Sequence, residues 1–151
     1  MNIDKIEIRI NKSTASDILN HLNEASAFFI PPLSETVDIA VYSAKLFNYA
    51  DRIEAWNEGK LIGLIAIYLN DEKHQTGFIT NVSVSPNHYK KGIAKKLMNE
   101  CIIYARTKKF EQIDLEVHES NDKAIALYKR IGFDEISDSG KMIKMRYNYV
   151  G

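Results

Sequence analysis

Hydrophobic and charged residues alternate at the start of the chain, before any helical spacing appears. The segment KIEIRI places Ile6, Ile8 and Ile10 on one face and charged side chains on the other, which is the pattern of a half-buried strand. A helix is predicted over ASDILNHLNEA, where apolar residues recur at helical spacing and where Ser13 or Thr14 can serve as the N-cap. The chain therefore begins with a strand followed by a helix.

Two prolines interrupt the pattern after this helix. Pro31 and Pro32 lack a backbone N–H and favour extended geometry in the residues before them, so FFIPPL is expected to be a loop. A second helix is predicted over residues 36–48. The segments RIEAW and KLIGLIAIYL follow, and the short loop NEGK between them predicts an antiparallel hairpin. The next strand, HQTGFITNVSVS, should end at Pro86.

A cluster of lysines lies where the next helical pattern begins. The apolar stripe of that helix consists of Ile93, Leu97, Met98, Cys101, Ile102 and Ala105. The helix N-terminus has free backbone N–H groups and the positive end of the helix dipole, which together favour anions. Gly92 allows a phosphate to approach the backbone. Lys90, Lys91, Lys95 and Lys96 add positive charge, although solvated surface lysines are an equally simple explanation of the cluster.

Composition narrows the classes of function. The chain has 151 residues, of which 45% are hydrophobic, enough for a globular domain with a buried core. Its 20 basic and 20 acidic residues give a net charge of zero, so no global field favours nucleic acid as a partner. Neither a dinucleotide-binding nor a P-loop glycine pattern is present. No run of about 18 apolar residues suggests a membrane span, so a soluble, cytoplasmic protein with no membrane partner is expected.

Cysteine and histidine usage argues against a metal site. Cys101 is the single cysteine, so it can form neither an internal disulfide nor a thiolate zinc site. His21, His74 and His88 do not have the spacing of metal ligands. No metal is therefore expected.

The stretch NVSVSPNHYKKGIAKKLM, followed by LEVHESNDKAIALYKRIGF, resembles the GNAT superfamily of N-acetyltransferases, which bind acetyl-CoA. The first part is similar to the family's pyrophosphate-binding motif, Gln/Arg-x-x-Gly-x-Gly/Ala. That motif falls on Tyr89, Lys90, Lys91, Gly92, Ile93 and Ala94. Tyr89 departs from it, because Gln or Arg is usual there. The second part is similar to a family strand and short helix, with landmarks at Asn121, Ala124, Ile125, Leu127, Tyr128, Gly132 and Phe133.

The resemblance implies an α/β fold over residues 1–151 as a single GNAT N-acetyltransferase domain. A mixed sheet of six or seven strands flanked by about four helices is expected. In such a fold the strand with Val82 and Val84 and the strand IDLEV run parallel but splay apart. The pantetheine arm of acetyl-CoA enters this gap, and Asn121 is expected to contact the cofactor; a plain N-cap role for Asn121 needs no ligand.

The same resemblance suggests the chemistry. It implies that Tyr128 is the general acid that protonates the departing thiolate, whereas the alternative is ordinary core packing of an aromatic ring. Family members often have a Glu on the strand before the loop, but TNVSVS contains none. Glu116 and His118 share one face of the later strand and are the candidates for a base, and each is also an ordinary polar strand residue.

The expected reaction is transfer of an acetyl group to a primary amine, with a small-molecule acceptor predicted. The alternatives are a protein or peptide N-terminus or lysine, and a non-catalytic acyl-CoA sensor. Phe28, Phe29 and Glu35 are expected to form the acceptor wall, although the rings can also anchor the loop and Glu35 can serve a helix N-terminus. A monomer or homodimer is expected.

Overall fold

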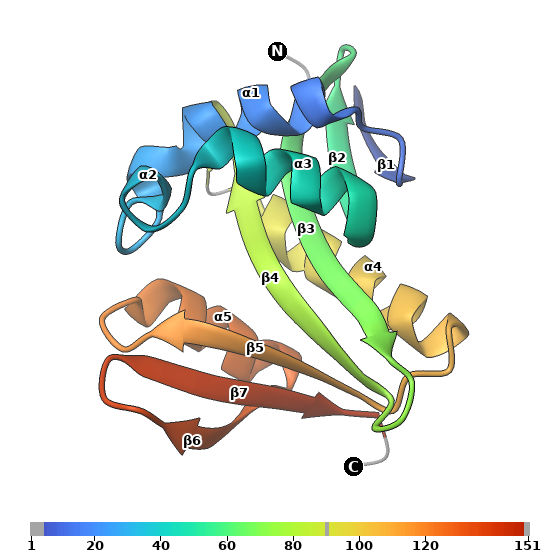
Figure 1. Cartoon of the computed structure of the whole chain (residues 1–151), viewed down its shortest axis with the longest axis vertical. Helices are drawn as coiled ribbons and strands as arrows, with labels where there is room; N and C mark the ends of the chain where they lie inside the picture. Colours follow the sequence, from blue (N-terminus) through green and yellow to red (C-terminus); the bar gives the residue numbers. More distant parts are fainter. Residues whose placement is uncertain (1–4, 90, 150–151) are drawn as a thin grey trace.

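A seven-stranded mixed sheet forms the centre of the protein (Figure 1). The structure is a computed structural model that describes residues 5–89 and 91–149. The strands are β1 (Ile6–Ile10), β2 (Asp51–Asn57), β3 (Lys60–Asp71), β4 (Thr76–Val84), β5 (Gln112–His118), β6 (Asp134–Asp138) and β7 (Met142–Asn148). They lie in the order β1-β2-β3-β4-β5-β7-β6. The mixed α/β sheet predicted from the sequence is confirmed.

Helices cover both faces of this sheet. They are α1 (Ala15–Ala25), α2 (Leu33–Thr36), α3 (Ile39–Tyr49), α4 (Ile93–Thr107) and α5 (Asp122–Ile131), with short 3-10 turns η2 (Ser26–Phe28) and η3 (Pro86–His88). Helices α1 to α3 lie over one face, and α4 and α5 lie behind the other (Figure 1). The single turn α2 adds one helix to the four that were expected.

Capping residues decide where the first helices begin. Thr14 accepts a hydrogen bond from Asp17 N at 3.1 Å, while the Asp17 carboxylate accepts one from Thr14 N at 2.9 Å, so a capping box starts α1. The predicted start of the next long helix at residue 36 is wrong. Val37 is extended, and Asp38 caps α3 by accepting from Val41 N at 3.0 Å.

The hairpin predicted across NEGK is confirmed. Strands β2 and β3 are antiparallel, with Asn57 opposite Lys60. The two residues between them, Glu58 and Gly59, have φ angles of 50° and 77°. Positive φ at both positions is the geometry of a type I′ turn, whose twist matches that of paired strands.

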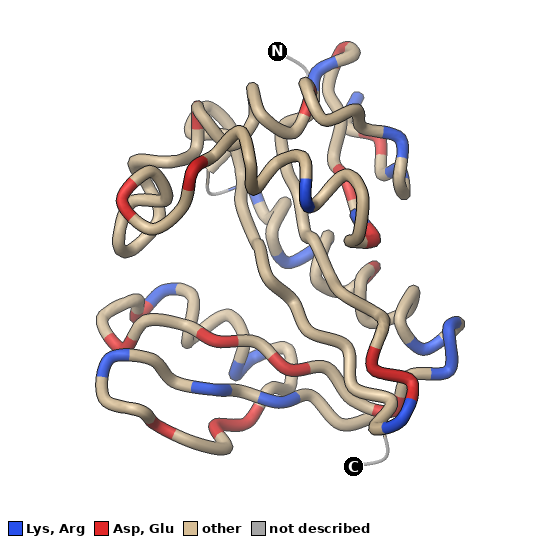
Figure 2. The backbone as a smooth tube through the Cα atoms, viewed as in Figure 1, with Lys and Arg blue, Asp and Glu red and all other residues tan. Residues whose placement is uncertain are grey.

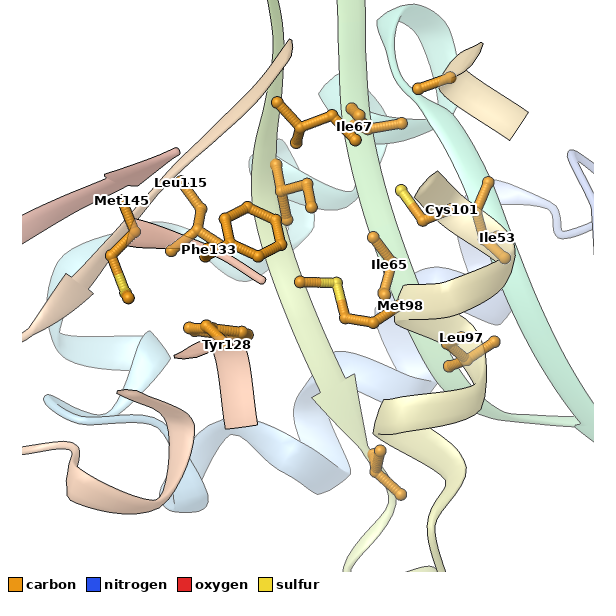
Figure 3. Close-up of a cluster of buried hydrophobic side chains, with 14 of the residues drawn as sticks. Ile53, Ile65, Ile67, Leu97, Met98, Cys101, Leu115, Tyr128, Phe133 and Met145 are labelled. Carbon is orange, nitrogen blue, oxygen red and sulfur yellow. The ribbon is translucent and has the colours of Figure 1, made fainter. Parts of the chain in front are cut away.

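Alternation along β3 separates two apolar cores. Ile65 and Ile67 belong to the core under α4 and α5, whereas Leu64 and Ala66 belong to the core under α1 and α3. Figure 3 shows the first core, in which Ile53, Ile65 and Ile67 meet Leu97, Met98 and Cys101 of α4, with Leu115, Tyr128, Phe133 and Met145 beside them. The predicted stripe of α4 is thus the face that packs on the sheet.

Strands β4 and β5 pair over only half of their length. Their parallel pairing runs from Thr76↔Gln112 to Ile79↔Leu115 and then ends. At that point β4 contains a bulge, because Asn81 lies opposite Ala66 while Ile79 lies opposite the next residue of β3, which leaves Thr80 as an extra residue. Beyond it the two strands diverge (Figure 1), as expected from the family resemblance.

Candidate active site

The gap between β4 and β5 opens into a cavity of about 570 Å³. Residues of both strands line it, together with α5, the segment after α1 and the loop before α4. The volume lies within the range of small-molecule sites in proteins. The splay of the sheet therefore creates a site between elements that are far apart in the sequence.

The cavity has two sides, because side chains alternate across the sheet. Leu115 and Val117 of β5 enter the core under α5, so Glu116 and His118 face the opposite way. We call the α5 side of the cavity the part lined by Val82, Val84, Ala94, Asn121 and Tyr128. We call the α1 side the part lined by Phe28, Phe29, Asn81, Ser83, Glu116 and His118.

The loop before α4 has the backbone of an open cradle. Gly92 is the N-cap in the left-handed region, with φ 72°, and a Cβ placed there would meet no atom within 4 Å. The side chain of Ile93 is buried in the core, so this residue offers only its backbone to a ligand. Lys91 is exposed, and Lys90 lies outside the described residues. The ring of Tyr89 contacts the ring of Phe28 edge-on, with the two ring centroids 5.3 Å apart.

Tyr128 packs in the core and also borders the cavity. Its ring packs against Phe133 with centroids 5.9 Å apart, and only 7% of the residue is exposed. It also lines the cavity, and its hydroxyl has no hydrogen bond to another described residue. Burial raises the pKa of Tyr128 to about 12, so the hydroxyl is protonated at neutral pH and can donate a proton.

Glu116 is an unpaired acid on the α1 side. The neighbouring acid of β5, Asp114, is bound by Arg146 at 2.7 and 2.9 Å and lies 3.6 Å from Lys144; Figure 2 shows the acidic and basic positions of β5 and β7 side by side. Glu116 is exposed and has no hydrogen bond or ion pair with a described residue. It is also the only carboxylate among the described residues that line the cavity.

His118 is held in an orientation that makes it a donor. Its Nδ1 accepts a hydrogen bond from Ser120 N at 3.1 Å and lies 2.8 Å from Ser120 Oγ. The neutral ring therefore carries its proton on Nε2. Since a base needs a free lone pair, Glu116 fits that role better than His118.

Asn121 caps α5 and borders the cavity. Its Oδ1 accepts a hydrogen bond from Ala124 N at 3.3 Å, which confirms the N-cap interpretation. Asn121 also lines the cavity, as do Val82 and Val84. Contact of these residues with acetyl-CoA stays a prediction.

The predicted acceptor wall is only partly brought together. Phe28 and Phe29 line the cavity, with Phe28 53% exposed. Glu35 is an exposed residue of α2 and is not among the residues that line the cavity. The acid therefore does not join the two rings at the cavity.

The sequence alone did not indicate a buried polar chain on the α1 side. His21 Nε2 lies 2.9 Å from Ser83 Oγ, which donates to Asn81 Oδ1 at 2.8 Å. Burial lowers the pKa of His21 to about 4, so the ring is neutral. The polar alternation of Asn81 and Ser83 in TNVSVS was the available signal, but His21 lies 62 residues away from Ser83 in the sequence.

The described residues contain neither a metal-ligand cluster nor a membrane-spanning helix. Within residues 5–89 and 91–149, no three or more His, Cys, Asp or Glu side chains are grouped so that they could hold a metal ion. No described helix is long and apolar enough to cross a membrane.

The family model described as Acetyltransferase (GNAT) family matches residues 17–133. The chain belongs to this family. An uncharacterized N-acetyltransferase of Methanocaldococcus jannaschii is 35% identical over 51% of this chain, but the match spans only 36% of that protein. A spermine/spermidine N(1)-acetyltransferase of Bacillus subtilis is 26% identical over 74% of this chain and 80% of that protein.

The chain is also similar to a plant N-alpha-acetyltransferase and to a solved N-acetyltransferase structure that contains coenzyme A. The N-alpha-acetyltransferase MAK3 of Arabidopsis thaliana is 32% identical over 76% of this chain and 61% of its own length. A crystal structure of the PaiA N-acetyltransferase from Thermoplasma acidophilum in complex with coenzyme A superimposes with a TM-score of 0.75 at 19% identity, covering 95% of this chain and 99% of that one. The fold is thus that of GNAT acetyltransferases.

Proposed function

We propose that this GNAT acetyltransferase transfers the acetyl group of acetyl-CoA to the primary amine of a small molecule. One observation carries the proposal: the splayed strands open a cavity that has the proton donor Tyr128 on its α5 side and the unpaired carboxylate Glu116 on its α1 side. An acid and a base on opposite sides of one cavity suit a transfer reaction in which one proton leaves the amine and another reaches the leaving group.

The α5 side fits acetyl-CoA, which would supply an activated acetyl thioester. Beyond Ile79 and Leu115, β4 and β5 no longer pair with each other, so an extended arm can enter between them and use their backbone groups. The open left-handed Gly92 and the N-terminus of α4 provide backbone N–H groups for the diphosphate. Lys91 adds charge beside them.

Each protein group has a definite proton role. Tyr128 is protonated at neutral pH and lies in the cavity without a competing hydrogen bond among the described residues, so it donates to the leaving thiolate. Glu116 accepts a proton from the incoming ammonium, directly or through a water, because alkyl amines with pKa near 10 arrive mostly charged. His118 orients the acceptor as a hydrogen-bond donor.

The class of acceptor has two candidates. A small molecule is favoured by the cavity volume of about 570 Å³, which an acceptor and the end of a pantetheine arm would fill. The second candidate is the amino terminus of a peptide, supported by the relative named as an N-alpha-acetyltransferase. The relative named for spermine and spermidine suggests a polyamine, but Glu116 is the one carboxylate among the described lining residues, which offers little to a multiply charged ligand.

The test is release of free coenzyme A from acetyl-CoA across a panel of amines, with mass spectrometry of the products. We include alkyl and aralkyl amines, polyamines, amino acid amides and short peptides. Amine-dependent release with a matching acetylated product is the expected result. Tight acetyl-CoA binding without release on any amine would instead indicate the acyl-CoA sensor.

A further inference from the structure

We propose that Phe28, Ile30 and Met142 bind the apolar part of the acceptor, so that the preferred acceptors are primary amines with a single positive charge and an alkyl or aralkyl group. The inference rests on the proposed function and specifies its acceptor. Two features of the cavity support it: exposed apolar side chains gather on its α1 side, and a single carboxylate lies among them.

Exposed apolar side chains converge on this cavity. Of the nine large apolar residues that are exposed in the described part of the chain, three line it: Phe28, Ile30 and Tyr89, which are 53%, 46% and 42% exposed. Single exposed apolar residues are ordinary on a protein surface, but a group of them at a cavity is typical of a ligand-binding surface. A ligand that covers these side chains removes their apolar surface from water, which favours its binding.

The loop that carries Phe28 and Ile30 is anchored by other residues. Phe29, which lies between them, packs against the core under α1 and α3. Ser34 N donates a hydrogen bond to Ser26 Oγ at 3.0 Å, which ties the two ends of the loop together. Because the anchored loop leaves Phe28 and Ile30 exposed, these two side chains form a wall that needs little ordering when a ligand binds.

Met142 lies on the same face of the sheet as the proposed base. It is directly opposite His118 in the antiparallel pairing of β5 and β7, and directly opposite residues share one face of a sheet. Glu116 is two residues from His118 and therefore shares that face as well. Met142, His118 and Glu116 all line the cavity, so an apolar side chain accompanies the carboxylate on the α1 side.

The charges of the α1 side suit one ammonium group. Glu116 is the one carboxylate among the described lining residues. An amine bound at Glu116 would place its carbon chain among Phe28, Ile30 and Met142. A second ammonium group among these side chains would lose water without gaining a counter-charge, which is costly. The acceptor that fits is therefore a singly charged amine with an apolar body.

The experiment measures kcat/KM of the wild type for propylamine, hexylamine and 1,6-diaminohexane. Propylamine and hexylamine have nearly the same basicity, so their ratio reports the burial of three further methylene groups. We expect hexylamine to exceed propylamine by at least about tenfold, and 1,6-diaminohexane to fall about tenfold below hexylamine. Equal values for propylamine and hexylamine, or a diamine as good as hexylamine, overturn the inference and leave acetyl transfer intact. Absence of turnover with every amine would instead refute the proposed function itself.

Two variants test whether the wall causes this selectivity. Phe28→Ala and Ile30→Ala should each lower the ratio of hexylamine to propylamine about fivefold, and this ratio does not depend on the fraction of active protein. Phe47→Ala is the matched control, because Phe47 is 44% exposed on α3 and is not among the residues that line the cavity. The control should keep the wild-type ratio. An unchanged ratio in both wall variants overturns the inference, and a raised KM for acetyl-CoA in those variants would then assign the wall to the cofactor.

A further probe separates a small amine from a peptide terminus, which can also be a single cation beside an apolar group. The peptide Leu-Ala-Ala amide provides this comparison. A kcat/KM below that of hexylamine supports a small-molecule acceptor, whereas a higher value overturns that assignment in favour of a peptide.

Discussion

The two faces of the sheet are built from different chemistry. The face under α4 and α5 is apolar, with Ile65, Leu97 and Met98 fully buried. The face under α1 and α3 contains buried polar groups, including the Glu54 and Arg52 pair and the chain from His21 to Asn81. The cavity joins the two faces.

This contrast has a functional meaning. On the α5 side the proposed partner is acetyl-CoA, whose arm and diphosphate need an open strand edge and a helix N-terminus, and both are backbone features. On the α1 side the acceptor must be told apart from other amines, which requires placed side-chain donors and acceptors. Apolar packing is therefore sufficient on the α5 side. The α1 side needs buried polar groups that fix one another's orientation through hydrogen bonds.

The largest effect is expected from breaking the polar face at Glu54. This residue is fully buried and accepts from Lys12 N and Ser13 N at 3.0 Å and from Trp56 Nε1 at 3.1 Å, with Arg52 Nε 3.4 Å away. Glu54→Ala would leave the buried charge of Arg52 without a counter-charge and these donors without an acceptor, so we expect the free energy of unfolding to fall by about 3–5 kcal/mol. Urea denaturation measures it.

The matched control for Glu54 lies on the apolar face of the same strand. Ile53→Val removes one buried methylene and should cost about 1 kcal/mol. Equal losses in the two variants would show that the two faces do not differ in the way described.

A pH experiment tests the burial of His21. In the folded chain the pKa of His21 is lowered from 6.5 to about 4, so in acid the unfolded chain takes up a proton before the folded one. The stabilisation is complete above pH 6.5 and is lost as the pH falls toward 4, by about 3 kcal/mol in total. We expect His21→Gln to lack this component. Identical pH dependence of unfolding in wild type and His21→Gln would contradict it.

Removal of the Tyr128 hydroxyl tests the proposed role of this residue as the proton donor. Tyr128→Phe keeps the ring on Phe133, so kcat should fall about 10²-fold while acetyl-CoA affinity is retained. With a pKa of about 12, this acid stays protonated, and the kcat profile should show no decline from Tyr128 between pH 7 and about 10. A wild-type rate in the variant would reduce Tyr128 to a core residue.

Glu116 should matter most where the amine is protonated. Glu116→Gln should lower kcat/KM for an alkyl amine by about 10²-fold at neutral pH, and the deficit should shrink as rising pH supplies free amine. His118→Gln serves as the comparison, because we expect it to alter KM more than the pH profile. A constant deficit of Glu116→Gln across pH would argue against its role as a base.

The smallest effects are expected at the cradle on the α5 side. Gly92→Val places a branched side chain at φ 72° in front of the loop, so we expect KM for acetyl-CoA to rise about tenfold. Lys91→Ala removes one solvent-screened charge and should raise the KM for acetyl-CoA about twofold. Calorimetry with acetyl-CoA and with a pantetheine analogue lacking the phosphates provides the control; equal affinity for the two ligands would remove the diphosphate site.

The sequence by itself determined much of the α5 side. Local signals were sufficient there, because each feature acts within its own strand-loop-helix unit: Gly92 and the stripe of α4 follow β4, and the Asn121 cap and Tyr128 follow β5. The same holds for the capping box of α1 and the type I′ turn at Glu58 and Gly59, where a few neighbouring residues set the backbone. Periodicity reports such features because their physical causes are short in range.

Only the tertiary structure decided the α1 side. The predicted start of α3 was wrong, because the helical spacing of apolar residues continues without interruption through Val37 and Asp38. In the structure these two residues are not helical and separate α2 from α3. Glu35 does not join Phe28 and Phe29 at the cavity. The chain from His21 to Asn81 depends on a helix and a strand that meet only through the sheet, and hydrogen bonds between residues so far apart leave no periodic trace in one sequence.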